Sequence, residues 1–421
     1  MAEHGGNSSG GLGRGPRAVV VVGGRGRCIL AAMGFLMAAM GPCRAVFGQC
    51  SYEIVILPTP NCYDGSAGGF GAGGIRDDSF IVGGYGCVFG PSAAAYWDGG
   101  IVQLLPNPPG YNASGAVDVN WSMQIVGNVP LTGLNKPRGV IWEGGVPTIL
   151  APPPNGTMSS AWAINEDGTV VGRWGNTSTG PGRAAAVWLN GQISLALYEA
   201  LGSPGSSGAN DINDDGAIVG WMGESQSFDA HAYVFQDGQV LDLGVIPGGY
   251  TAEAHAINNH NLILGIGRVA IAAPPGFERH AFVWEIGVMV DLSAQFGLGE
   301  CVFGAVNDLG QAVAYSQVEG LFMWHDGELV LLRDRIPAAW LQTLTTPTDI
   351  NNIGQIVDAG ANVILQPVGW MPGDVDRNCT VNVQDLLTLL GEWGNLGSFA
   401  DTNADGFVNV TDLLILLANW G

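Results

Sequence analysis

Lysine is nearly absent from this chain of 421 residues, in which Lys136 is the single copy. Lysine and arginine together number 15, against 37 aspartate and glutamate residues, and the formal net charge is −22. Because neutralising nucleic-acid phosphates takes clustered lysine and arginine, this composition excludes nucleic acid as a partner. The excess of acidic residues instead suits cation binding and solubility outside the cell.

Long apolar runs are also lacking. The apolar run Cys28–Met40 has 13 residues, which is short of the roughly 20 that a transmembrane helix needs, and Arg25 and Arg27 lie just before it. A positive segment, a short apolar run and small residues before Gln49 form the pattern of a secretory signal peptide. We therefore predict a signal peptide over residues 1–48, a secreted protein located outside the cell or at its surface, and no transmembrane anchor in the mature chain.

Several enzyme signatures are missing as well. Beyond residue 49 the chain has no G-x-S-x-G, no H-E-x-x-H and no phosphate-binding glycine loop of the G-x-x-x-x-G-K type, and its cysteines show no C-x-x-C spacing. These absences argue against the common serine-hydrolase, zinc-protease and nucleotide-binding sites. Five cysteines follow residue 49, so in an oxidising compartment at least one is free or pairs with another molecule.

Glycine, in contrast, is abundant, with 67 copies, and much of it belongs to an internal repeat. A phrase of the form Ile-Asn-x-x-Gly-x-Ile-Val-Gly is clearest at 164–172 and 212–220. The seven copies, spaced by 44 to 49 residues, begin at Ile75, Val119, Ile164, Ile212, Ile257, Val306 and Ile350. After each of the first six comes an apolar run that ends in an aromatic residue, namely Trp97, Trp142, Trp188, Phe235, Trp284 and Trp324. A glycine turn and another apolar stretch complete the unit.

Each unit therefore offers four short strands, and its Asn/Asp/Gly turn supplies residues that tolerate positive φ. Four strands in a period of about 45 residues are typical of a propeller blade. A continuous solenoid is the alternative, but it needs capping units that the sequence lacks. The seventh unit has no fourth strand, whereas a spare strand, Tyr52–Leu57, lies near the start of the chain. We predict a mainly β fold, a seven-bladed propeller over residues 49–371 that this spare strand closes.

The architecture leads to one predicted disulfide. Cys62 lies in the connection from the closing strand into the first blade, and Cys87 follows the second strand of that blade, so both belong to one face of the ring. Cys50 precedes the closing strand and belongs near the opposite face, roughly 20 Å away by strand rise. Since a bridge needs Cα atoms within about 7 Å, we predict that Cys62 pairs with Cys87.

The end of the chain contains a second kind of repeat, two 12-residue acidic loops that start 27 residues apart. Positions 1, 3, 5, 7, 9 and 12 of each loop offer the oxygen atoms that a calcium ion requires. The predicted ligands are Asp374, Asp376, Asn378, Thr380, Asn382 and Asp385 in the first loop and Asp401, Asn403, Asp405, Phe407, Asn409 and Asp412 in the second. A short apolar helix follows each loop, and we expect the two helices to pack together because neither is long enough to be stable alone. We predict a small all-α module over residues 372–421 that binds two calcium ions.

Both repeats resemble known families. The long unit resembles the extracellular HAF repeat, named after a His-Ala-Phe sequence that occurs here at 280–282, and this resemblance implies secretion and fold but no reaction. The paired loops resemble a type I dockerin, an EF-hand-like module with aspartate at position 12 and one helix after each loop. In that family the module docks onto a cohesin domain, often to display enzymes of polysaccharide catabolism. The chain departs from the family at position 6 of the first loop, where Cys379 replaces glycine, and at positions 10 and 11, where Val383-Gln384 and Val410-Thr411 replace Ser/Thr pairs.

The polar residues that recur in every unit are interpreted as structural. The Asn and Asp residues of the turns have a role in turn formation, the histidines His231 and His280 in hydrogen bonding, and the aromatic series in packing between blades. Four positions break the repeat and form our candidate binding surface at one mouth of the central channel. They are Trp162, Asn210, Glu253 and His255.

Two functions stay open at this point. One is a non-catalytic binding or adhesion propeller, attached through its dockerin-like tail to a cohesin-like protein or a cell-surface component, with polysaccharide as a candidate ligand. The alternative is a glycoside hydrolase or polysaccharide lyase displayed in the same way. We favour the first and assign no catalytic residue, because an active site should break the repeat with clustered unique carboxylates, and the unique carboxylates here are scattered.

Overall fold

The computed structural model describes most of the chain after residue 50. The chain divides into two units, Met1–Gln49 and Cys50–Gly421, and the predicted signal peptide lies outside the described residues. These are 51–59, 68–87, 92–130, 136–176, 183–202, 206–223, 230–271, 276–325, 327–369, 373–376, 381–394, 400, 402 and 407–420.

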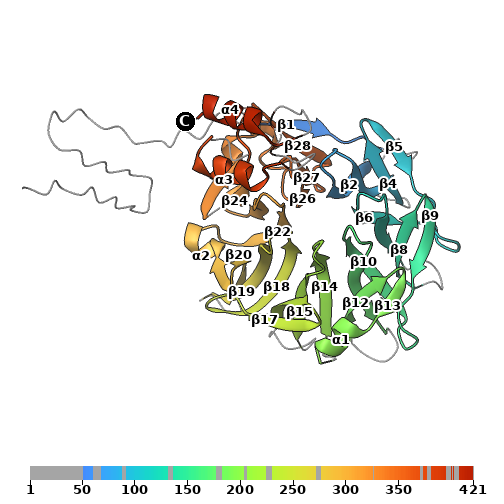
Figure 1. The fold of residues 1–421 in the computed structure, drawn as a ribbon. Coiled ribbons are helices and arrows are strands. Elements are labelled where there is room, and N and C mark those ends of the chain that lie inside the picture. Colours follow the sequence, from blue (N-terminus) through green and yellow to red (C-terminus); the bar gives the residue numbers. More distant parts are fainter. Residues whose placement is uncertain are drawn as a thin grey trace, which may run out of the picture. The chain divides into compact units, whose positions relative to one another are not determined.

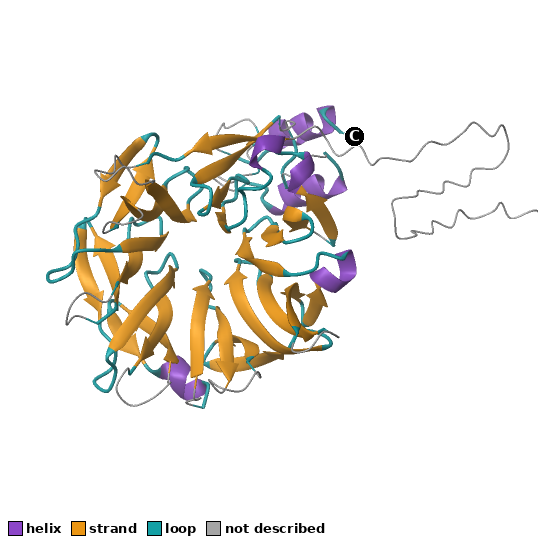
Figure 2. Ribbon diagram, turned by 180° about the vertical axis from the view of Figure 1, so that it is seen from behind, coloured by secondary structure: helices purple, strands orange, loops and turns teal. Residues whose placement is uncertain are grey.

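Seven antiparallel four-stranded sheets, here called blades, surround a common centre in the second unit (Figures 1 and 2). In blades 1 to 6 the strands follow one another in the chain and pair in that order. Blades 1 to 3 contain β2 (Gly68–Ile75), β3 (Ile81–Cys87), β4 (Ala93–Asp98) and β5 (Ile101–Leu104); β6 (Gly115–Val119), β7 (Ile125–Val129), β8 (Arg138–Glu143) and β9 (Val146–Leu150); and β10 (Met158–Ile164), β11 (Val170–Gly175), β12 (Arg183–Leu189) and β13 (Gln192–Ser194).

Blades 4 to 6 repeat the same order. They contain β14 (Ser206–Ile212), β15 (Ile218–Gly223), β16 (His231–Gln236) and β17 (Gln239–Gly244); β18 (Gly249–Ile257), β19 (Ile263–Ala270), β20 (Phe277–Glu285) and β21 (Val288–Asp291); and β22 (Cys301–Val306), β23 (Ala312–Ser316), β24 (Gly320–His325) and β25 (Glu328–Leu331). The short helices α1 (Ala196–Ala200) and α2 (Leu292–Phe296) follow the fourth strands of blades 3 and 5. Two 3-10 turns, Leu332–Asp334 and Ala338–Trp340, precede blade 7.

Blade 7 combines the two ends of the propeller. It contains β26 (Pro347–Ile350), β27 (Ile356–Asp358), β28 (Val363–Val368) and, as its fourth strand, β1 (Ser51–Ile56). Strand β1 pairs antiparallel with β28, from Ser51 opposite Val368 to Ile56 opposite Val363. The seven-bladed propeller and its closure by the first strand, both predicted from the repeat, are therefore confirmed.

The repeated phrase has a local explanation in each blade. Its turn places one residue at positive φ in every copy, at Ser79, Met123, Gly168, Gly216, Asn261, Gly310 and Gly354, as the turn chemistry predicts. The glycine that ends the phrase is required by a close approach of the neighbouring strand. A Cβ at Gly172 would lie 2.0 Å from the carbonyl oxygen of Ser160, and one at Gly220 would lie 2.0 Å from that of Gly208.

A ring of hydrogen bonds joins the seven blades at these turns. The side-chain amide of each repeat asparagine donates to the main-chain carbonyl of the equivalent residue in the next blade, over 2.8 to 3.1 Å. The series runs through Asn120, Asn165, Asn213, Asn258, Asn307 and Asn351. Blade 1 has Arg76 instead, and its Nη1 donates to the carbonyl of Asn120 over 3.2 Å, which closes the circle. The asparagine thus does more than form a turn, since it also fixes the contact between blades.

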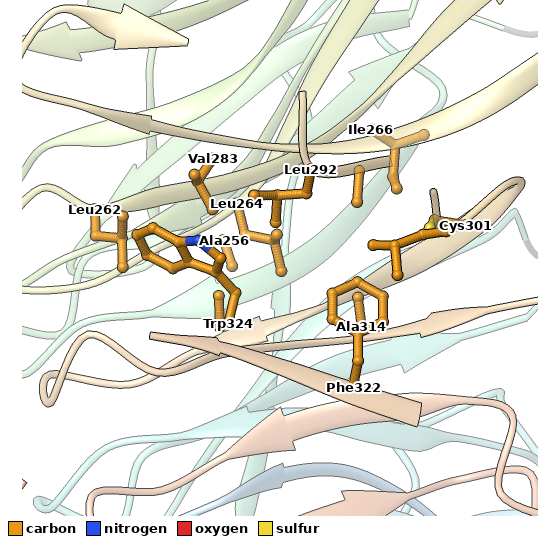
Figure 3. Packing of buried hydrophobic residues seen from close by; sticks show 13 residues of the cluster. Ala256, Leu262, Leu264, Ile266, Val283, Leu292, Cys301, Ala314, Phe322 and Trp324 are labelled. Atoms are coloured by element: carbon orange, nitrogen blue, oxygen red, sulfur yellow. The ribbon is translucent and has the colours of Figure 1, made fainter. Parts of the chain in front are cut away.

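Apolar packing between blades completes the ring. Figure 3 shows the cluster between blades 5 and 6, in which Leu264 and Val283 meet Phe322 and Trp324. Trp142 and Trp188, at the repeated aromatic position, are buried in the corresponding clusters, and the Nε1 of each donates to a main-chain carbonyl of the preceding connection, over 2.8 and 2.9 Å. The predicted packing role of this aromatic series is confirmed.

Three blades carry a partly buried aspartate whose side chain reaches the main chain of the next blade. Asp349 accepts hydrogen bonds from the main-chain N–H groups of Ile75 and Ile350 over 2.9 and 2.8 Å. Asp118 and Asp211 do the same in blades 2 and 4. Burial raises the pKa of Asp349 to about 7 and that of Asp211 to about 6, although the N–H donors oppose this effect. Burial also raises the pKa of Asp118 well above its ordinary value.

These raised pKa values predict a pH dependence of stability. In the unfolded chain the pKa of Asp349 is near 3.8, and in the folded protein it is about 7. Its contribution to stability is therefore fully present below about pH 4 and is lost as the pH rises through about 7. We expect the melting temperature of the wild type, relative to that of Asp349→Ala, to fall as the pH is raised from 5 to 8.

Alanine is a matched replacement, because Ala163 and Ala256 occupy the same position in blades 3 and 5. Thermal unfolding of both proteins at saturating calcium measures the difference, in which the effects of titrating groups that do not interact with Asp349 cancel. A difference that stays constant or grows with pH would contradict the assignment.

Candidate functional site

Three carboxylates meet at the start of α3 (Val383–Gly391). Asp374 and Asp376 precede the helix and Asp385 lies in its first turn, and all three are buried. One carboxylate oxygen from each lies within 4.8 Å of the others. Two oxygens that bind one calcium ion at about 2.4 Å can be no more than about 4.8 Å apart. The predicted ligands at positions 1, 3 and 12 therefore fit a calcium ion in both chemistry and spacing.

The same local geometry recurs at α4 (Val410–Ala418). Asn382 and Asn409, at position 9 of the loops, are the helix N-caps, and each belongs to a capping box with the aspartate at position 12. Asp385 accepts from the main-chain N–H of Asn382 over 2.7 Å, and Asp412 accepts from that of Asn409 over 2.9 Å. The aspartate at position 12 therefore anchors each loop to its helix.

The structure describes the second loop less fully than the first. Asp412 also accepts from the main-chain N–H of Thr402 over 2.8 Å, and the side-chain amide of Asn409 donates to the carbonyl of Phe407 over 3.0 Å. The remaining predicted ligands lie outside the described residues. They are Asn378, Thr380, Asp401, Asn403 and Asp405.

The two helices pack against each other but leave much of their apolar surface in solvent. Leu389 and Leu416 are fully buried in one cluster, against which Leu386 and Leu413 pack. On each helix and just after it, four large apolar side chains are between 46% and 60% exposed. They are Val383, Leu387, Leu390 and Trp393 around α3, and Val410, Leu414, Leu417 and Trp420 around α4. The expected packing between helices thus uses only one side of each.

The first loop also contacts the propeller. The side-chain amide of Gln311, in the turn of blade 6, donates to the main-chain carbonyl of Asp376 over 3.0 Å. Gln311 is itself held by Asn307, whose Oδ1 accepts from its main-chain N–H over 3.0 Å. Asn307, which belongs to the ring of asparagines, is therefore linked through Gln311 to the main chain of Asp376, a predicted calcium ligand.

At the channel mouth formed by the repeat turns, all seven blades line a cavity of about 210 Å³. Its rim has one residue from each blade, namely Asp77, Trp121, Glu166, Asp214, Asn259, Asp308 and Asn352. Main-chain N–H groups around the rim donate to the side chain in the next blade, for example Glu166 to Asp214 over 3.0 Å and Asp308 to Asn352 over 2.8 Å. These polar side chains therefore have a structural role in joining blades.

Three of the four sequence-predicted surface residues occupy one equivalent position. Trp162, Asn210 and His255 each lie at the β-bulge of the innermost strand of blades 3, 4 and 5. Glu253 lies two residues before His255, and its Oε2 is 3.9 Å from the Nε2 of His255. The side-chain amide of Asn210 donates to the carbonyl of Ala254 over 2.6 Å. None of the four lines the cavity at the repeat turns, so they do not form part of that mouth.

Burial shifts both titrating groups of this set toward their neutral forms. It lowers the pKa of His255 to about 4, and it raises the pKa of Glu253, an effect that the charge of Arg268 opposes. His255 is therefore uncharged at neutral pH, and the pair does not form a strong ion pair there.

The histidines of the repeat have carboxylate partners. The Nδ1 of His231 lies 3.0 Å from Asp242, and that of His280 lies 2.8 Å from Asp291. Both contacts join the third strand of a blade to the end of its fourth, which agrees with a structural role. Among the cysteines, Cys301 is a buried free thiol. The predicted pair cannot be placed, because Cys62 and the side chain of Cys87 lie outside the described residues.

Comparisons with known proteins find distant structural likenesses alone. No family model matches the sequence, and no curated protein matches it. The β-propeller domain of the Trilobed protease from Pyrococcus furiosus is 15% identical with a TM-score of 0.35, over 52% of this chain and 65% of that one. A Hadza microbial sialidase is 12% identical with a TM-score of 0.32, over 72% and 66%. A gluconolactonase from Xanthomonas campestris is 15% identical with a TM-score of 0.32, over 61% and 90%.

These likenesses identify no activity. The chain spans a little less than two thirds of the first of these structures. In the part of the chain that the structure describes, every helix is too short or too polar to cross a bilayer.

Proposed function

We propose that this is a secreted calcium-binding protein with two functional parts. Its C-terminal module, residues 372–421, is dockerin-like, binds two calcium ions and attaches the protein to a cohesin-type partner or a cell-surface component. Its propeller is a non-catalytic binding or adhesion domain. The observation that carries the proposal is the meeting of Asp374, Asp376 and Asp385, whose carboxylate oxygens lie within 4.8 Å of one another while all three residues are buried.

Three buried carboxylates at this distance repel one another strongly unless a cation balances them. The oxygen-only donor set favours a hard cation, and calcium accepts the six to eight oxygens that a full loop offers. The second loop repeats the spacing, and Asp412 repeats the capping bonds of Asp385. This duplication supports a second ion rather than a chance cluster.

The exposed apolar faces support an attachment role. Soluble proteins rarely leave such contiguous apolar surface uncovered. Here the same four positions are exposed around both helices, for example Leu387 at 56% and Leu414 at 60%. A partner that covers one face can cover the other in the same way. Because a calcium ion would bind both the loop and the first turn of the helix that follows it, the ion would also stabilise the helices that present these apolar faces.

The propeller's own contacts favour binding over catalysis. General acids and bases must be available to a substrate, but Asp118, Asp211 and Asp349 are occupied by main-chain N–H groups of neighbouring blades. The rim carboxylates Glu166 and Asp214 likewise join blades. These acidic side chains therefore have a structural role, because they form hydrogen bonds that join neighbouring blades.

A single experiment tests both parts. The mature protein, and the same protein ending at residue 371, are incubated with a polysaccharide panel at saturating calcium while retention and the release of reducing ends or unsaturated products are followed. We expect binding without turnover by both proteins, and calcium-dependent capture by a cohesin domain of the full-length protein alone. Turnover that one carboxylate substitution, such as Glu253→Gln, abolishes would show that the propeller is an enzyme. Cohesin capture that persists in EDTA would contradict the calcium-dependent attachment.

A further inference from the structure

Two arginines in blade 3 share one face of their sheet. Arg173 of β11 pairs with Ala185, and Arg183 of β12 pairs with Gly175. Residues that pair directly, or that lie two apart on one strand, point to the same face of a sheet. The two side chains are therefore diagonal neighbours. This face packs against blade 4, as the cluster of Val171 and Ala185 with residues of that blade shows.

This arginine pair differs from other arginines of the protein. Arg76, Arg279 and Arg333 each form an ion pair, with Asp78, Glu300 and Glu319. Among the residues that the structure describes, neither Arg173 nor Arg183 has a carboxylate partner. The Nε of Arg173 is buried without a hydrogen-bond partner. In a protein with 37 acidic and 15 basic residues, two neighbouring arginines without a carboxylate are unexpected.

The energetics of Arg173 are unfavourable as the structure stands. Burial lowers the pKa of Arg173, and the charge of Arg183 lowers it further. Both effects mean that the charged guanidinium is poorly stabilised by its surroundings. An oxyanion that accepts from the terminal N–H groups of both arginines would offset the repulsion between them, because bonds between guanidinium and oxyanion are charge-assisted.

Aromatic rings lie beside the charged groups. The guanidinium of Arg173 is 4.7 Å from the centre of the Trp162 ring. Across the boundary, a Cβ at Gly208 would lie 3.1 Å from Cζ3 of Trp162 and 2.8 Å from Nε1 of Trp221. Gly208 therefore makes room for the indole of Trp162 at this boundary, whereas Trp221 pairs with Ala232 and belongs to the face of blade 4 that packs against blade 5. Trp162 is only partly buried, so part of its side chain remains accessible to solvent.

We propose that Arg173, Arg183 and Trp162 form a binding site for an acidic sugar residue, whose carboxylate or sulfate oxygens bind the arginines while its ring packs on the indole of Trp162. Arginine pairs suit oxyanions, and indole rings present a flat apolar surface with an N–H donor at one edge. The proposal rests on the proposed binding function of the propeller and assigns that function an anionic polysaccharide. The proposal also assigns a ligand to Trp162, which the sequence placed in a candidate binding surface without indicating what it binds.

Calorimetric titration of the mature protein, at saturating calcium, tests this site with two matched pairs of probes. One pair is a short oligogalacturonate and its methyl ester, and the other is dextran sulfate and dextran. We expect the anionic member of at least one pair to bind more tightly, with an affinity that weakens as salt is raised. The preferred pair identifies the oxyanion as a carboxylate or a sulfate.

The variants locate the site. Arg173→Gln and Arg183→Gln should each weaken binding of the anionic probe roughly 10-fold to 100-fold, as expected for loss of a charge-assisted hydrogen bond. Arg279→Gln, which removes the same charge from an arginine paired with Glu300, should leave binding unchanged. Arg183 is exposed, so its variant remains informative even if Arg173→Gln does not fold. Trp162→Ala should weaken binding of both members of a pair.

The outcomes separate this proposal from the proposed function. Equal binding of charged and neutral probes, or an equal loss in Arg183→Gln and Arg279→Gln, would overturn the anion site while leaving a binding propeller intact. Cleavage of the anionic probe that depends on Arg183 would support the site but contradict the non-catalytic function.

Discussion

A mature protein that lacks residues 51–58 is expected to aggregate rather than fold. Strand β1 supplies the fourth strand of blade 7, and without it the edge of β28 has no partner along its whole length. An exposed, apolar strand edge is a template for pairing with other chains. The deletion also removes Leu57, which is 1% exposed and packs with Val357 and Ile364 in the cluster that joins blades 7 and 1.

Expression yield, size-exclusion profile and melting temperature measure the effect. Two adjacent point variants act as matched controls, because Leu57 is buried and Ile56 is 65% exposed. Leu57→Ala should cost about 2–5 kcal/mol in the free energy of unfolding, whereas Ile56→Ala should change it by less than about 0.5 kcal/mol. A soluble, monomeric deletion variant with an unchanged melting temperature would be incompatible with closure of the ring by β1.

The second large effect is expected from calcium removal. Helices α3 and α4 have nine residues each, and isolated helices of that length are unstable in water. Binding of calcium to the loops should therefore be coupled to folding of the module. In the full-length mature protein we expect amide protection of α3 and α4 to require calcium, while that of the propeller strands does not. Hydrogen exchange with calcium and with EDTA measures both regions in one sample.

Variants of the first loop test which residues bind the ion. Asp374→Asn and Asp376→Asn keep the size of the side chain but remove a charge, and each should weaken calcium binding about 10-fold or more, because ligand charge determines affinity in such loops. Gln384→Ala lies beside the same helix start but removes no predicted ligand, so it should have little effect. Protection of α3 and α4 that is the same in EDTA would refute the coupling.

The propeller could be predicted from the sequence because its signals are local and repeated. Seven turns with Asn, Asp or Gly residues, which alternate with apolar strands, define the repeating unit. Because the seventh unit lacks its fourth strand, the spare strand Tyr52–Leu57 is the natural candidate to complete that blade. The structure confirms both, with β1 as the fourth strand of blade 7. The calcium ligands could be proposed in the same way, because loop positions are fixed by spacing along the chain alone.

Other features could not be predicted from the chain. The sequence assigned the repeat asparagine to a turn, but its second bond reaches a carbonyl 44 to 49 residues away in the next blade. Likewise, nothing in the sequence indicates that the guanidinium of Arg173 lies over the ring of Trp162 or that Arg183 is its diagonal neighbour, since these residues meet only through strand register.

The sequence by itself therefore determined the blade, the number of blades, the strand that closes them and the twelve candidate calcium ligands, because periodicity, turn chemistry and loop spacing act between near neighbours in the chain. The tertiary structure alone decided which polar groups join blades, which apolar faces of α3 and α4 stay in solvent, and which arginines lack an acidic partner among the described residues. Those properties depend on what lies across a blade boundary, and the curvature of the closed ring, which no local pattern encodes, determines which residues meet there.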